Sequence, residues 1–433
     1  MENNKLILFK LAIGLGGLAC FALLRRQTDG SGTTAGAFLR SCVILWLITR
    51  VDLFLTVFVF AGYEVTSDVP TYYYEPAKCV LAGQLPYRDF STSYGPLFPY
   101  VAAAAVSVWD SPKAILLLAM AFEAGALLLW RRVAERTLPT ETVRMGMLLY
   151  LCNPVAILNV AVAGQNQVWV SCLLAAAFAL TLLRRDWLAG FLIGVSVVAV
   201  KLLGLMFVPY WWLVSRARRQ FSFGLVLALA LGLLPFWFAG ADILRPLKLE
   251  GALTTSGNLP FLGSVAGLEP NQQWIGRGWS FVLLASLLGL SWRLARRVKA
   301  SGDASLSLLG LTALLLVFML VSKKSYTNYL NLLMLPLCFS AATVLRERWQ
   351  QPAFLLWSCV AALEPSLWHR WLAQASLGEA WRRALAGGSS IITPMLFTGV
   401  ELVLLAGYLA LLWLILRQAL TAGESSEGSK TAP

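Results

Sequence analysis

The polar segment that follows the apolar run at residues 41–62 holds the first residues that could do chemistry. It reads EVTSDVPTYYYEPAKCVLAGQLPYRDFSTSYGPLFPYV, with Asp68 about six residues beyond the apolar run. A carboxylate beside apolar walls keeps its charge while its basicity rises, so Asp68 could act as a general base on a hydroxyl group. Two plainer roles stay open. Asp68 could be a solvated loop acid, or it could cap a helix over residues 72–81, because Ser67 and Asp68 precede Pro70.

The same segment offers further polar and aromatic candidates. Arg88 and Asp89 are adjacent in PYRDF, so they could contact a substrate or could form a local turn and ion pair. Tyr94 is one of several tyrosines in this segment, and such residues are typical of a membrane-interface belt; the others considered are Tyr72, Tyr73, Tyr74 and Tyr87. The alternative for Tyr94 is stacking against a sugar.

Three lysines could neutralise an anionic group. Lys201 lies between two short apolar stretches, where an ionisable residue indicates function or, alternatively, a side chain that extends to the membrane surface. Lys323 and Lys324, in VSKKSYTNYLN, fall on the predicted outer side, against the usual bias of positive charge toward the inside. The phosphate of a lipid is the counter-ion that such lysines would suit.

Amides and a single histidine complete the candidates. The GQNQ sequence places Gln165 and Asn166 at a turn that could bind sugar hydroxyls or could be only a turn. His369 is the one histidine and falls in a predicted loop. Arg50 and Asp52 lie inside an apolar run and could pair with each other or with neighbouring helices. The sequence has no CxxC pair, Walker motif or GxGxxG, which weighs against a metal cluster and an ATP-driven pump.

The elements that must position these residues are membrane helices. Of the 433 residues, 58% are hydrophobic and 13% are charged, so most of the chain must face lipid or other helices. The net charge of +13 comes from short clusters of arginine and lysine at the ends of apolar runs. Such clusters mark cytoplasmic loops, and no single basic patch suggests a nucleic-acid partner.

Placing the basic clusters inside predicts an all-α, polytopic transmembrane bundle of about thirteen helices with the N-terminus outside. The predicted spans are 6–24, 41–62, 113–130, 145–163, 167–183, 187–200, 202–214, 221–240, 278–294, 305–322, 328–345, 352–366 and 394–417. Residues 1–420 would form one integral membrane domain, and 421–433 a disordered cytoplasmic tail. The outward loops would cover about 63–112, 241–276 and 365–393.

Two of these regions depart from simple spans. The stretches 187–200 and 202–214 are too short to cross alone, so we expect two helices that meet around Lys201. The apolar stretch 97–109 is also short, and a membrane crossing there would place every later basic cluster on the outer side of the membrane. It is therefore predicted to be an interfacial helix in the first outward loop.

The order of these features resembles the GT-C superfamily of membrane glycosyltransferases, most closely glycosyltransferase family 87 and related polyprenyl-phosphate-mannose-dependent mannosyltransferases. The matching pieces are Asp68, YYYEPAKCVLAGQLPYRDF, YGPLFPY, the NP and GQNQ sequences, the AG…VK stretch that ends at Lys201, and KKSYTNYLNLLMLPL. The resemblance implies that Asp68 is the catalytic base and that Lys201, Lys323 and Lys324 bind the donor phosphate. Because TSDV supplies one aspartate and no paired DxD acid, the resemblance leaves a need for Mg²⁺ or Mn²⁺ open.

The expected function is therefore transfer of a sugar, predicted to be mannose, from a polyprenyl-phosphate donor to a lipid or glycan acceptor. The protein would lie in the plasma (inner) membrane among lipids, with its active site on the extracytoplasmic side. A transporter or flippase of lipid-linked sugars is one alternative, and an oligosaccharide polymerase or ligase is another. Most polar candidates gather on the predicted outer side, whereas a transporter should place charges near mid-membrane, so an enzyme is favoured.

Overall fold

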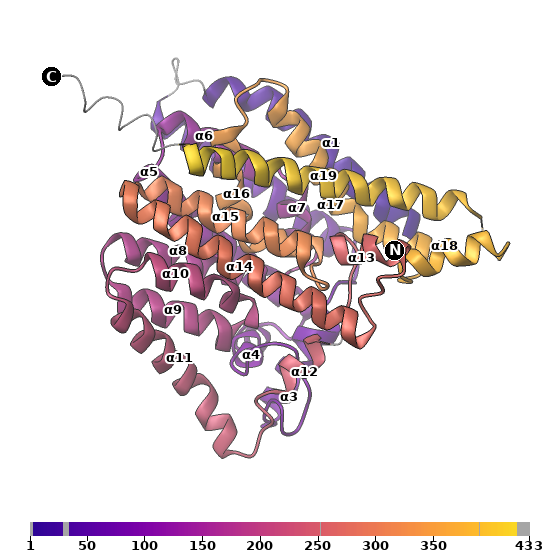
Figure 1. The fold of residues 1–433 in the computed structure, drawn as a ribbon, viewed down its shortest axis with the longest axis horizontal. Coiled ribbons are helices and arrows are strands. Elements are labelled where there is room, and N and C mark those ends of the chain that lie inside the picture. Colours follow the sequence, from indigo (N-terminus) through magenta and orange to yellow (C-terminus); the bar gives the residue numbers. More distant parts are fainter. Residues whose placement is uncertain (1–2, 29–33, 252, 389, 422–433) are drawn as a thin grey trace. The chain divides into compact units, whose positions relative to one another are not determined.

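The described part of the chain is helical, as predicted. A computed structural model describes all residues except 1–2, 29–33, 252, 389 and 422–433, so the predicted cytoplasmic tail lies almost wholly outside the described residues (Figure 1). The described residues form no strand, and their only β-type pairing is an isolated bridge between Pro86 and Phe90. A helix satisfies its own backbone polar groups, which a membrane interior requires.

Among the residues that the structure describes, seven helical segments are long and apolar enough to cross a membrane. They are Lys5–Leu24, Ala35–Phe60, Pro112–Glu135, Arg218–Phe238, Gln273–Ser301, Ala304–Val321 and Ile392–Thr421. An eighth results if Thr140–Leu151 and Pro154–Val162 form one interrupted span. The predicted count of about thirteen is not confirmed, because other predicted spans are apolar helices of 10–17 residues, such as Gln167–Leu182 and Met334–Val344.

The chain divides into two compact units, joined in part by α7 (Pro154–Ile157). Unit 1 comprises Met1–Asp29, Thr137–Val155 and Leu253–Pro433, and unit 2 comprises Gly30–Arg136 and Ala156–Ala252. The single membrane domain predicted over residues 1–420 stays a prediction.

Unit 2 is a helical body with several interrupted helices. Its elements are α2 (Ala35–Trp46), η2 (Leu47–Asp52), η3 (Leu55–Phe60), η4 (Val69–Tyr74), α3 (Glu75–Leu81), α4 (Phe98–Val108), α5 (Pro112–Glu135), η5 (Leu158–Val162), α8 (Gln167–Leu182), α9 (Asp186–Ala199), η6 (Leu202–Phe207), α10 (Val208–Val214), α11 (Arg218–Phe238) and α12 (Arg245–Gly251). Helices α9 and α11 lie side by side in Figure 1 and pack through glycines. A Cβ atom on Gly224 would come within 1.8 Å of the Trp187 carbonyl oxygen, so the two backbones are in direct contact.

Unit 1 is a second helical body. Its elements are α1 (Asn3–Leu24), η1 (Arg25–Thr28), α6 (Thr140–Leu151), α13 (Leu259–Gly263), η7 (Ser264–Ala266), α14 (Gln273–Ser301), α15 (Ala304–Val321), η8 (Thr327–Leu332), α16 (Met334–Val344), α17 (Gln350–Leu372), α18 (Leu377–Leu385) and α19 (Ile392–Thr421). Helix α15 is its buried centre, packed against α14 on one side and α19 on the other (Figure 1). Helix α1 packs along α17, and α6 along α16.

The helix breaks and short helices near the candidate residues were predicted more accurately from the sequence than the number of membrane spans was. Helix α9 ends at Ala199 and the tighter η6 begins at Leu202, so two helices meet around Lys201 as predicted. Helix α4 forms inside the predicted stretch 97–109, and η4 with α3 covers the predicted helix 72–81. Four described segments, η2, η3, η4 and η5, are π-helical, with each hydrogen bond reaching five residues along the chain, a geometry frequent at functional sites.

Two predicted loops contain more helix than expected. Helices α12 and α13 lie within 241–276. Helix α17 continues through Pro365 to Leu372, so His369 lies in the last turn of a helix and not in a loop. A proline inside a helix removes one hydrogen bond without necessarily ending the helix, and for that reason the loop boundary predicted at residue 365 was wrong.

Candidate active site

Asp68 lies directly before η4 with its side chain turned toward the GQNQ turn. Its carboxylate is half-buried and accepts a 3.1 Å hydrogen bond from the Gln165 side-chain nitrogen. It makes no capping bond to the helix that it precedes, so the helix-cap role left open by the sequence does not apply. The hydrogen bond from Gln165 therefore fixes the direction in which the carboxylate points.

The GQNQ turn holds Gln165 in place. Gly164 has a positive φ of 58°, and a Cβ atom there would come within 2.9 Å of the Leu116 side chain and 3.0 Å of that of Val69. The turn therefore needs glycine. The Gln165 backbone nitrogen donates to the Asn159 carbonyl at 2.8 Å, and its side-chain oxygen accepts from the Tyr73 hydroxyl at 3.4 Å.

An aromatic wall continues from Tyr73. Its ring meets Tyr94 edge-on with centroids 5.1 Å apart and Phe98 at 5.0 Å, and Phe98 in turn lies 5.1 Å from Trp169. Tyr73, Phe98 and Trp169 are fully buried, and Tyr94 is nearly so. The membrane-interface belt is therefore the wrong interpretation for Tyr73 and Tyr94, whereas Tyr72 is more than half exposed.

Lys201 reaches this wall from the break between α9 and η6. Its backbone is extended, and its ammonium nitrogen lies 5.2 Å from the centre of the Tyr94 ring, within cation–π range. The loop after Tyr94 is hydrogen-bonded to the end of α9, beside the break at Lys201. The Gly95 nitrogen donates to the Val200 carbonyl at 3.0 Å, and the Leu97 nitrogen donates to the Val198 carbonyl at 2.9 Å. A Cβ atom on Gly95 would come within 2.3 Å of the Val198 carbonyl oxygen.

Several buried polar atoms near the start of α8 have no hydrogen-bond partner in the described structure. These atoms are the side-chain nitrogen and oxygen of Asn166, the side-chain oxygen of Gln167 and the indole nitrogen of Trp169. An unsatisfied buried polar group costs about 1–3 kcal/mol, so such groups call for bound water or a ligand. Asn166 is fully buried and directly follows Gln165, the residue that donates a hydrogen bond to Asp68.

A chain of contacts within unit 2 thus connects the candidate residues. It runs from Asp68 to Gln165, Tyr73, Tyr94 and Lys201. The linked residues combine a carboxylate, a cation and aromatic faces. The family model of glycosyltransferase family 87 matches residues 92–322, more than half of the chain. The chain belongs to glycosyltransferase family 87. No curated protein matches it in sequence.

Family 87 membership makes this protein a membrane glycosyltransferase of the GT-C type. The matched range includes Tyr94, the GQNQ turn and Lys201. It begins after Asp68 and ends before Lys323 and Lys324. A sugar donor and an acceptor in the membrane follow from the family.

Arg88 and Asp89 have local partners in this family 87 enzyme. The Arg88 guanidinium lies 2.9 Å from the Asp89 carboxylate, which also accepts from the Leu85 backbone nitrogen at 2.8 Å. These two contacts hold the pKa of Asp89 below its ordinary value of 3.8. The local turn and ion pair left open by the sequence is what forms, and contact with a substrate stays a prediction.

Lys323, Lys324 and His369 belong to unit 1. The Lys323 carbonyl accepts from the Thr255 nitrogen at 3.0 Å, and the Lys324 ammonium lies 5.9 Å from the Tyr326 ring centre. Both lysines are partly exposed, and His369 is exposed. Their contacts with donor or acceptor stay predictions.

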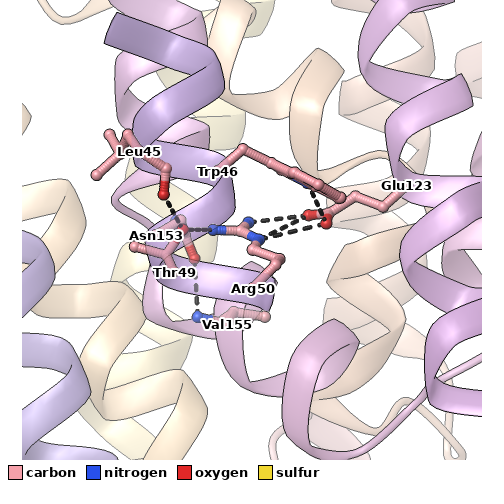
Figure 2. Close-up of polar contacts among 7 residues, drawn as sticks. All are labelled: Leu45, Trp46, Thr49, Arg50, Glu123, Asn153 and Val155. Carbon is pink, nitrogen blue, oxygen red and sulfur yellow. Dashed lines mark hydrogen bonds and ion pairs between the residues drawn. The ribbon is translucent and has the colours of Figure 1, made fainter. Parts of the chain in front are cut away.

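The sequence did not single out Glu123, which pairs with the buried Arg50. The Arg50 guanidinium points at the Glu123 carboxylate, with the closest nitrogen and oxygen 2.9 Å apart and both side chains fully buried (Figure 2). The Trp46 indole nitrogen donates to the same carboxylate at 2.9 Å. Arg50 therefore pairs with a neighbouring helix and not with Asp52, which is exposed. Glu123 is the one acid inside the predicted span 113–130, a signal that could have identified it.

Two more buried acids went unpredicted in unit 1. Both oxygens of Glu401 accept from the Gly257 backbone nitrogen, at 3.1 and 3.0 Å. The Glu364 carboxylate accepts a hydrogen bond from Ser256 and interacts electrostatically with the Lys10 ammonium. No group of three or more His, Cys, Asp or Glu side chains suited to a metal occurs among the residues that the structure describes.

Proposed function

We propose that this family 87 enzyme transfers a sugar, predicted to be mannose, from a polyprenyl-phosphate donor to a lipid or glycan acceptor. The reaction would take place on the extracytoplasmic side of the inner membrane. The observation that carries the proposal is the link from the half-buried Asp68 carboxylate through Gln165 and Tyr73 to the aromatic wall under Lys201. Family membership favours an enzyme over the alternative of a transporter or flippase.

In the proposed step, the acceptor hydroxyl attacks the anomeric carbon while the bond from that carbon to the phosphate oxygen breaks. The hydroxyl proton passes to the Asp68 carboxylate, and the bonding electrons leave with the polyprenyl phosphate. Gln165 holds the carboxylate in one orientation through its 3.1 Å hydrogen bond. A base at fixed geometry contributes typically about 10²–10⁴-fold to such a rate.

The leaving phosphate gains negative charge in this step, and Lys201 is the cation proposed to stabilise it. A preorganised charge away from bulk water stabilises a developing anion more than the same charge does in water. Lys201 is nearly buried, and its nitrogen lies over the Tyr94 ring. Lys323 and Lys324 remain further candidates for the phosphate, and Asn166 and Tyr94 are proposed to contact the sugar. The step does not require Arg88, Asp89 or His369.

The test is a transfer assay with purified protein, radiolabelled polyprenyl-phosphate mannose and crude lipid or glycan acceptors. We expect Asp68→Asn to lower kcat by about 10²–10⁴-fold, because the amide cannot accept the hydroxyl proton. Asp52→Asn is the matched control, since Asp52 is an exposed carboxylate of unit 2. Equal transfer by Asp68→Asn and wild type would contradict the proposed base. Transfer from a polyprenyl-diphosphate donor instead would replace the proposed donor class.

A further inference from the structure

The turn at residues 85–90 contains a backbone conformation that its sequence does not favour. Tyr87 has a φ of 67°, in the left-handed region, where a bulky side chain is an uncommon occupant. Glycine or asparagine would adopt this conformation at lower cost. A tyrosine at such a position indicates that its side chain is needed there.

The turn is held rigid from both ends. The Tyr87 nitrogen donates to the Phe90 carbonyl at 2.9 Å, and the Asp89 nitrogen donates to the Leu85 carbonyl at 2.9 Å. The Asp89 carboxylate closes the turn by accepting from the Leu85 nitrogen, and Arg88 pairs with that carboxylate. Arg88 and Asp89 therefore fix the direction in which Tyr87 points.

The Tyr87 side chain points inward and is only 2% exposed. Its ring packs with Phe236 and Ala241, at the end of α11. Its hydroxyl donates a hydrogen bond to the Tyr94 carbonyl oxygen. Burial raises the pKa of the Tyr87 phenol, so the hydroxyl keeps its proton and remains a donor at neutral pH.

Tyr94 is the point where the parts of the candidate site meet. Its ring packs edge-on against Tyr73, which bonds Gln165, and lies under the Lys201 ammonium. The next residue, Gly95, donates to the Val200 carbonyl beside Lys201. The hydrogen bond from Tyr87 to the Tyr94 carbonyl therefore helps to hold two things in place. One is the Tyr94 ring in the aromatic wall, and the other is the backbone next to Lys201.

We propose that Tyr87 is a positioning residue that sets the place of Tyr94, and through it of Lys201, for binding the phosphate of the donor. The role rests on the proposed function, because it assigns the donor phosphate to Lys201. Tyr87 touches neither substrate nor reacting atoms. Its effect should therefore be on kcat/KM for the donor, with little effect on the KM for the acceptor.

The kinetic test compares Tyr87→Phe with Tyr100→Phe. The first removes one hydroxyl and keeps the ring that packs on Phe236. The second is the matched control, since Tyr100 also lies against Phe236, with ring centres 6.1 Å apart, and is 36% exposed. We expect Tyr87→Phe to lower kcat/KM for the donor by about five-fold, the effect of one lost hydrogen bond, with the acceptor KM within two-fold of wild type. An unchanged kcat/KM for the donor, or an equally large effect on the acceptor KM, would overturn the proposal.

A second test does not depend on activity. Hydrogen exchange of the Gly95 and Leu97 amides, measured by mass spectrometry, reports whether the loop is still hydrogen-bonded to the end of α9 beside Lys201. We expect faster exchange in Tyr87→Phe than in wild type and Tyr100→Phe. Unchanged exchange would overturn the positioning role even if the enzyme used another donor. Faster exchange in a protein whose wild type transfers no sugar from polyprenyl phosphate would instead contradict only the proposed function.

A third variant separates the side chain from the backbone. Tyr87→Asn suits the positive φ but lacks the ring and the phenol. If the conformation of the turn alone mattered, this variant would keep the wild-type kcat/KM for the donor and the wild-type amide exchange. We expect it to exceed Tyr87→Phe in both effects, and wild-type values would overturn the proposal.

Discussion

Asp68 and Glu123 are both carboxylates of unit 2, but their partners give them different tasks. Asp68 is half-buried and accepts a hydrogen bond from a neutral amide, with no cation among its hydrogen-bond partners in the described part of the chain. Glu123 is fully buried and accepts from Arg50 and from the Trp46 indole, so its charge is paired with a guanidinium. The first arrangement suits chemistry, and the second fixes η2 to α5.

The ion pair predicts a large loss of stability on removal of one charge. Glu123→Gln leaves Arg50 buried without its carboxylate, and breaking a buried pair in this way costs about 3–5 kcal/mol. We expect a lower midpoint of thermal unfolding for purified protein in detergent. Glu135→Gln, which breaks the partly exposed Arg131 pair, is the control and should cost about 0–1 kcal/mol. Similar midpoints for the two variants would show that the Arg50 pair does not contribute as expected.

A pH dependence follows from Asp110. Hydrogen bonds from the Lys78 ammonium and the Tyr74 hydroxyl hold the pKa of its carboxyl below the ordinary value of 3.8. A lowered pKa in the folded state stabilises the protein above pH 3.8, and this contribution disappears as the pH falls through the lower folded value. We expect wild type to be more stable than Asp110→Asn near neutral pH. The difference in unfolding midpoint should shrink below pH 3.8, and a constant difference would contradict the assignment.

The element that carries Lys201 depends on close helix packing. Helix α9 leads into the break at Lys201 and meets α11 through Gly190, Gly194 and Gly224. A Cβ atom on Gly190 would come within 2.1 Å of the Phe221 carbonyl oxygen, a backbone atom that cannot move alone. Helix packing in membranes relies on such small residues because lipid and side chains are equally apolar.

Gly190→Ala should therefore move α9 away from α11. We expect a loss of about 1–3 kcal/mol of stability from overpacking, together with weaker donor binding because Lys201 moves with the helix. Gly289→Ala is the control, since a Cβ atom on Gly289, within α14, has nothing within 4 Å. Unfolding midpoints and donor KM values for both variants provide the measurement. A neutral Gly190→Ala would mean that the helix pair adjusts without cost.

Local signals predicted some elements well, and long-range contacts account for what was missed. The break at Lys201 was predictable because each flanking apolar stretch is too short to cross alone, and the GQNQ turn was predictable from its glycine. The Arg50 partner was not predictable, because Glu123 lies 73 residues away and only the fold brings them together. Likewise, Tyr87 was predicted to be interfacial from its residue type, whereas its burial depends on Phe236 and Ala241 at the far end of another helix.

At the scale of the whole molecule, the direction of insertion decides where the proposed reaction takes place. The basic clusters predict that the segment before Asp68 faces outward and that the segment around Arg136 and Arg144 faces the cytoplasm. The donor and acceptor would then be used on the outer face. The described part of the chain contains seven apolar helices that are long enough to cross a membrane, or eight with the interrupted pair, and this is compatible with such a multi-pass protein.

Single cysteines at two exposed positions test this direction. Thr66→Cys lies two residues before Asp68, and Glu141→Cys lies in the first turn of α6, each in a background from which the seven native cysteines have been removed. We expect a membrane-impermeant maleimide added to intact cells to label position 66 and not 141, because the positive-inside bias places only the first of them outside. Both should react once the membrane is opened, which controls for accessibility. Labelling of position 141 alone in intact cells would reverse the orientation and place the Asp68 site on the cytoplasmic face, where a nucleotide sugar could serve as the donor instead.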